Sequence, residues 1–245
     1  MDETPIKAGQ TGKGKLKQAW FWPLYGDGDE VVFTYSASRS WQHIEKTLKK
    51  DFKGTLISDV DAAYASYASY ASYASYASYA SYASYASYAK QNEQMTHAQC
   101  WVHSRRTFIE AESQETGAVR KAIDYIAALY HIEDQAYAQN LSGDPKHQYR
   151  LEHSKPVVDS FYEWCDKQIR RDDLTPSNPL SKALGYVMKR EAALRVFRED
   201  PDVPLDTNHL ERTLRPIPMG RNYPRFSIME GCLRQIPPSR YFSAL

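Results

Sequence analysis

The chain has 245 residues, of which 42% are hydrophobic and 25% are charged, and its formal net charge is +1 at pH 7. This length and composition are typical of a soluble globular protein with one good-sized domain or two small ones. No apolar run reaches the roughly 18 residues of a membrane span, and the acidic start at Asp2 is unlike a secretory signal. Three widely spaced cysteines fit a reducing compartment, so we expect a cytoplasmic protein.

The first third of the chain predicts β-strands. Gln18–Tyr25 is rich in aromatic residues, Glu30–Ser36 is apolar and β-branched, and the GDGD sequence between them favours a hairpin turn. The polar, glycine-rich segment Lys7–Lys17 predicts a loop. Apolar residues at helical spacing then predict a helix over Trp41–Phe52, and a short buried strand, Thr55–Ser58, follows. We expect one mixed sheet with at least one crossover.

Eight Ala-Ser-Tyr units occupy Ala65–Tyr88. Repetition this regular is typical of replication slippage in the coding DNA. Alanine favours a helix, but a period of three winds the tyrosines around its whole surface, so the segment 64–90 is expected to be helical or disordered. The alternative is a tyrosine-rich segment that self-associates through β-pairing.

Residues 105–200 lack strand alternation and predict a helical block. A short strand before it runs into a helix that is expected to begin near Ser104. Helical spacing of apolar residues is then found over Ala118–Ala138, Val157–Ile169 and Leu180–Phe197, with chain breakers between these segments.

Few residues indicate chemistry by themselves. Asp59 follows an apolar strand, where a carboxylate either faces a cleft or caps a helix. Glu211 lies in the first turns of a helix expected to be capped by Asp206 or Thr207, and an ordinary surface pair with Arg215 is the alternative. Basic residues cluster at several places, but solvated helix faces have the same composition, so charge leaves nucleic-acid binding open.

Cys100 and His103 have a zinc-like spacing. A zinc site needs about four ligands, and no second Cys/His pair is near in the sequence. A buried cysteine with a hydrogen-bonded histidine at the strand end is therefore favoured over a metal site.

Five segments together resemble the insertion-sequence-66 family of bacterial transposases. They are Asp2–Pro5 (DETP), Phe33–Ser40 (FTYSASRS), Gly54–Tyr64 (GTLISDVDAAY), Cys100–Phe108 (CWVHSRRTF) and Leu205–Arg221 (LDTNHLERTLRPIPMGR). The resemblance implies an α/β, ribonuclease-H-like mixed sheet with a large all-helical insert before the last catalytic helix. It also implies that CWVH belongs to the framework and binds no zinc.

By the same resemblance, Asp2, Asp59 and Glu211 are the catalytic and metal-binding acids, with Asp2 and Asp59 on neighbouring strands. They would hold two Mg²⁺ (or Mn²⁺) ions, because hard cations take oxygen ligands. The implied activity is cleavage and strand transfer of DNA, with transposon ends and target DNA as partners. The resemblance also implies that the intact protein is a homo-oligomer associated with the nucleoid. The candidate phosphate contacts are Arg105, Arg106, Arg212 and Arg215.

The implied organisation divides the chain into six parts. They are a first core part (1–63), the repeat (64–90), a continuation of the core (91–106), the helical insert (107–200), the catalytic-Glu helix (201–221) and an atypical tail (222–245). The sequence departs from the family in having Asp2 so near the start, in the repeat after Asp59, and in a tail that a frameshift would explain. These departures predict impaired activity. The alternative is a catalytically dead remnant that at most binds DNA or self-associates.

Overall fold

The computed structural model describes six stretches of the chain: residues 4–8, 17–26, 31–38, 41–48, 52–58 and 95–208. The chain divides into two compact units, one formed by residues 1–50 with 208–245 and the other by residues 51–207. The Ala-Ser-Tyr repeat and the tail 222–245 lie outside the described residues. None of the described helices is long and apolar enough to cross a membrane.

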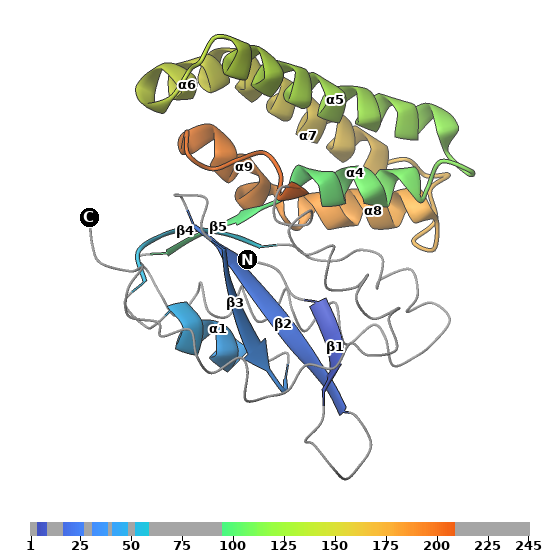
Figure 1. The fold of residues 1–245 in the computed structure, drawn as a ribbon. Helices are drawn as coiled ribbons and strands as arrows, with labels where there is room; N and C mark the ends of the chain where they lie inside the picture. Colours follow the sequence, from blue (N-terminus) through green and yellow to red (C-terminus); the bar gives the residue numbers. More distant parts are fainter. Residues whose placement is uncertain are drawn as a thin grey trace. The chain divides into compact units, whose positions relative to one another are not determined.

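The described residues of the first unit include a three-stranded antiparallel sheet and a helix that follows it in sequence (Figure 1). Strands β1 (Thr4–Ala8), β2 (Lys17–Tyr25) and β3 (Val31–Ser36) are neighbours in that order, which confirms the predicted hairpin. The predicted loop is shorter than expected, because its two ends belong to β1 and β2.

Helix α1 (Trp41–Leu48) is attached to this sheet through one side of its surface. Its residues Ile44 and Leu48, four positions apart, are both buried. The ring of His43 lies 5.1 Å from that of Trp22 in β2, and its Nε2 is 3.0 Å from the Thr34 hydroxyl in β3. The predicted helix extended to Phe52, but Phe52 is not helical, so that boundary was wrong.

The second unit has a two-stranded parallel sheet made of β4 (Gly54–Ser58) and β5 (Met95–Gln99). Gly54 opens β4 with a φ of 126°, a conformation that glycine adopts without strain. The mixed α/β class is confirmed. The expected single mixed sheet differs from what is observed, because the described strands form two sheets. Strands β1 and β4, which adjoin Asp2 and Asp59 in sequence, were expected to be neighbours but belong to different sheets.

Between β5 and residue 200 the structure describes seven helical segments, as expected for this part of the chain. They are α4 (Trp101–Ile109), α5 (Thr116–Ala138), α6 (Gly143–Tyr149), the π-helical turn η1 (Arg150–Ser154), α7 (Lys155–Ile169), α8 (Pro179–Met188) and α9 (Glu191–Glu199). In Figure 1, α5 runs beside α7 and α4 beside α8, and α9 packs against β5.

The core of this unit is apolar and aromatic. Helix α5 buries the face predicted from its periodicity, including Val119, Ile126 and Leu129. The rings of Trp101 and Phe108 both meet Phe161 of α7 edge-on, with centroids 5.5 and 6.0 Å away. Such edge-to-face pairs add to the gain from burial alone.

Two predicted helix boundaries were wrong. The helix expected near Ser104 begins at Trp101, and Cys100 before it makes no side-chain cap. The segment Leu180–Phe197 forms two helices, which separate at Lys189 and Arg190. Neither glycine nor proline marks this break, so no local pattern indicated it.

Candidate active site

The three predicted acids lie outside the described residues, but each adjoins a described element. Strand β1 begins two residues after Asp2, and β4 ends at Ser58, directly before Asp59. Asn208, the last described residue, is already helical and precedes Glu211 by three positions. The predicted helix of Glu211 lies beyond the described residues and stays a prediction. The described parts therefore show how the chain enters the segments of Asp59 and Glu211.

The end of β4 is fixed by its neighbour β5. The two strands are parallel, so their carboxyl ends lie at the same edge, with Ser58 opposite Gln99. The buried Ser58 hydroxyl is 2.7 Å from Nε2 of His97. Burial lowers the pKa of His97 to about 4, so its ring is neutral at neutral pH. A neutral imidazole and a hydroxyl share this bond without burying a charge next to Asp59.

The chain that leads to Glu211 returns to this same place. The backbone N–H of Trp101 donates to the carbonyl oxygen of Leu205 at 3.1 Å. Val203, Leu205 and Thr207 are all buried. The short stretch Gln99–Trp101 thus pairs with the strand that precedes Asp59 and hydrogen-bonds the segment that precedes Glu211.

Within the CWVH motif, sequence reasoning missed the structural contacts of Trp101. Its side chain is fully buried, and its indole Nε1 donates to the carbonyl oxygen of Leu194 in α9 at 2.9 Å. We call the buried stretch 203–207 the return segment. The backbone and side chain of Trp101 therefore connect the end of β5, helix α9 and the return segment. Its position directly after a buried strand was the signal, but the partners are far away in sequence.

Cys100 and His103 have structural surroundings. Cys100 is buried at the end of β5, as expected, while His103 is buried in the first turn of α4 instead of at the strand end. Its Nε2 is 3.4 Å from Nη1 of Arg106. Over the stretches that the structure describes, no three His, Cys, Asp or Glu side chains gather as a metal site would require.

Of the four predicted phosphate-binding arginines, two are described. Arg105 is exposed on α4, whereas Arg106 is half-buried and contacts His103. Arg212 and Arg215 lie outside the described residues. Helix α4 starts at the edge where β4 and β5 end, so the exposed Arg105 is the better placed of the described pair.

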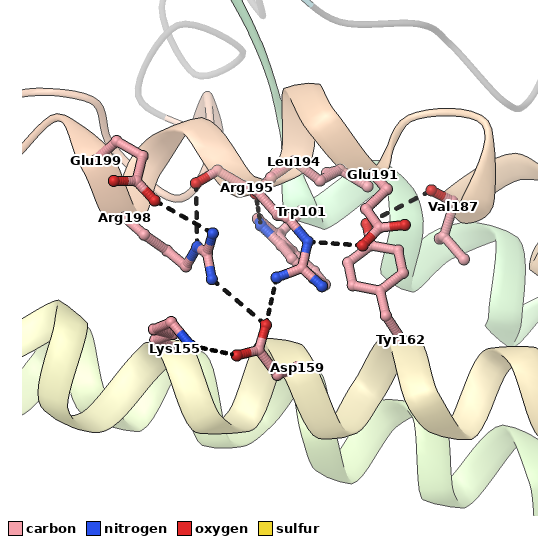
Figure 2. Close-up of polar contacts among 10 residues, drawn as sticks. All are labelled: Trp101, Lys155, Asp159, Tyr162, Val187, Glu191, Leu194, Arg195, Arg198 and Glu199. Carbon is pink, nitrogen blue, oxygen red and sulfur yellow. Dashed lines mark hydrogen bonds and ion pairs between the residues drawn. The ribbon is translucent and has the colours of Figure 1, made fainter.

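A charged cluster that the sequence did not reveal joins α7 to α9 (Figure 2). Asp159 of α7 forms ion pairs with Lys155 of its own helix and with Arg195 and Arg198 of α9. Hydrogen bonds from Lys155 and Arg195 lower the pKa of Asp159. The two α9 arginines also form ion pairs with Glu191 and Glu199 of α9, so the positive and negative charges of the cluster balance. The cluster therefore links α7 to α9.

A family model and several proteins are similar to large parts of this chain. Residues 1–232 match the model of a family described as "Transposase IS66 family". The uncharacterized protein y4qI of Sinorhizobium fredii is 26% identical over 241 residues, which are 94% of this chain and 41% of y4qI. The uncharacterized protein y4hP of the same organism is 32% identical over 140 residues, 52% of this chain and 25% of y4hP. The chain therefore spans about two fifths of the length of y4qI. No solved structure matches it significantly.

Proposed function

This chain belongs to the IS66 family of transposases, and on that premise we propose that it carries the core that cuts and joins DNA strands. In this proposal Asp2, Asp59 and Glu211 form one site, and transposon ends and target DNA are the substrates. The core is ribonuclease-H-like, residues 107–200 are its helical insert, and the intact protein acts as a homo-oligomer.

One observation carries the proposal. Gln99 lies opposite Ser58 in the parallel sheet, and Trp101, two residues on, donates to Leu205. Asp59 is one residue beyond the first of these contacts, and Glu211 is six residues beyond the second. The segments that lead to two acids more than 150 positions apart in sequence thus contact one short stretch of chain, which supports a shared site.

The proposed ligands suit divalent cations. Three carboxylates form a set of hard oxygen donors, which Mg²⁺ and Mn²⁺ prefer over sulfur or nitrogen. When bound, two such ions supply charge stabilisation to the attacking and leaving oxygens of phosphodiester cleavage. The buried Ser58–His97 bond holds the strand end that orients Asp59, and Arg105 supplies a positive charge for a DNA phosphate.

Calorimetric titration with Mn²⁺ tests the proposed site. The wild-type chain is compared with Asp59→Asn/Glu211→Gln and with a matched control, Asp144→Asn/Glu152→Gln, which neutralises two exposed acids of the same types. We expect binding by the wild type and the control, and none by the site variant. Full binding by the site variant would refute the site. No binding by any of the three would favour the catalytically dead remnant.

The DNA contact is tested separately. Arg105→Glu is compared with Arg120→Glu, which reverses the charge of another exposed arginine, on α5. Loss of one phosphate contact reduces the slope of log affinity against log salt by about 0.9 for duplex DNA. We expect this reduction for Arg105→Glu alone, and equal slopes in both variants would contradict the assignment.

A further inference from the structure

Arg150 is a fully buried charged residue in the middle of the helical block. It begins the π-helical turn η1, between α6 and α7, and its side chain is inaccessible to solvent. Burying an unpaired guanidinium is costly, so a buried arginine has to have its donors satisfied. Turns of π-helix inside longer helices are frequently found at functional positions.

The guanidinium of Arg150 contacts two different parts of the chain. Toward α5, its Nε and Nη2 donate to the two carboxylate oxygens of Glu133, at 2.8 and 2.6 Å. Toward α9, its Nη1 lies 2.6 Å from the carbonyl oxygen of Phe197, 3.0 Å from that of Asp200 and 3.3 Å from that of Pro201. The fork of Arg150 thus binds a carboxylate on one side and closes the end of a helix on the other.

The contacts of Arg150 with α9 stabilise the carboxyl end of that helix. The last carbonyl groups of a helix lack partners within it and carry a partial negative charge, which a cation stabilises. Arg150 binds the carbonyls at the point where the chain leaves α9 and turns. The same turn is fastened to β4, because the Thr55 hydroxyl donates to the Asp200 carboxylate at 3.1 Å.

Helix α9 also has contacts with α7 and with Trp101. Asp159 of α7 pairs with Arg195 and Arg198, as Figure 2 shows. The indole of Trp101 binds the carbonyl of Leu194. These contacts fix the position of α9, and Arg150 binds the end of the helix. Together they set the direction in which the chain leaves α9 toward Leu205.

We propose that Arg150 is a positioning residue for the segment 203–207, which precedes Glu211: by binding the carbonyls at the end of α9, it directs this segment to the carboxyl end of β5. The helical insert therefore takes part in building the active site. A catalytic effect of Arg150 rests on the proposed function. The ordering of the return segment by Arg150 can be measured independently of any metal binding.

The experiment compares the wild-type chain with Glu133→Leu/Arg150→Met. This double variant removes both charges together, because removing one alone would leave the other buried and unpaired. The readout is hydrogen exchange at the amides of Trp101 and Val203, which donate to the carbonyls of Leu205 and Asp200. We expect exchange to accelerate at least about tenfold, the factor for losing one charge-assisted hydrogen bond, and Mn²⁺ affinity to fall by a similar factor.

A second variant separates positioning from general destabilisation. Ile126→Ala removes a fully buried side chain from α5, the helix of Glu133. In this control the two amides and Mn²⁺ affinity should change only as far as global stability changes. Equal effects in both variants, or unchanged exchange in Glu133→Leu/Arg150→Met, would overturn the proposal. If the wild type binds no Mn²⁺, the proposed metal site fails, and amide exchange still decides whether Arg150 positions the segment.

Discussion

Replacing Trp101 by phenylalanine tests the contact that joins α4 to α9. The change keeps an aromatic ring against Phe161 and Phe197 but removes the indole N–H that donates to the Leu194 carbonyl at 2.9 Å. The lost hydrogen bond costs about 1 kcal/mol, and the unfilled volume at a fully buried position adds about 1–3 kcal/mol. We therefore expect the free energy of unfolding to fall by about 2–4 kcal/mol, a large part of a typical domain's stability.

Urea denaturation followed by circular dichroism at a helical wavelength measures this loss. Trp164→Phe is the matched control, because Trp164 lies 6.2 Å from Phe161 in the same aromatic core but is only half-buried. Within the part of the chain that the structure describes, its indole nitrogen has no hydrogen bond. The control should lose about 1 kcal/mol or less. Equal losses in the two variants would show that the Leu194 bond contributes nothing.

Three further changes have defined outcomes. His97 has its pKa lowered from 6.5 to about 4, so the unfolded chain binds a proton that the folded chain excludes. The free energy of unfolding should therefore fall by up to about 2–3 kcal/mol as pH drops from about 6.5 to about 4, and His97→Gln should flatten this slope in denaturation series at several pH values. Asp159→Asn should cost only about 0.5–1 kcal/mol in urea denaturation, because this ion-pair centre is partly exposed. Deleting Ala65–Tyr88 leaves 12 of the 36 residues between Ser58 and Met95. Since about a dozen residues suffice for a parallel crossover, circular dichroism should show a folded chain, whereas unfolding would make the repeat structurally essential.

Local patterns predicted much of the fold. The aromatic and β-branched residues of β2 and β3 indicated a hairpin, and the spacing of Val119, Ile126 and Leu129 indicated α5 and its buried face. These features depend on neighbours within a few positions. The start of α4 was missed because Cys100 offers no capping side chain. The break before α9 was missed because the apolar spacing continues through Leu194.

The site was predicted less completely, for a different reason. The position of Asp59 after a buried strand pointed to a strand-end carboxylate, and the resemblance supplied the other two acids. The contacts that position their segments join residues far apart in sequence, such as Trp101 with Leu205 or Arg150 with Pro201. An arginine in a helix is ordinarily exposed, so nothing in the pattern indicated that Arg150 would be fully buried.

In the proposed site Asp59 and Glu211 hold the same cation, and metal-directed cleavage of the chain can show whether they do. With added hydrogen peroxide and ascorbate, Fe²⁺ bound in place of Mg²⁺ reduces the peroxide to a hydroxyl radical and hydroxide, and ascorbate regenerates the Fe²⁺. The radicals cut the chain close to the ion, and mass spectrometry locates the cuts. We expect cuts near both Asp59 and Glu211, suppressed by excess Mg²⁺, and we expect Asp59→Asn to abolish both sets together. Cuts near Glu211 that persist at full strength in Asp59→Asn would place the two acids in separate sites and contradict the account.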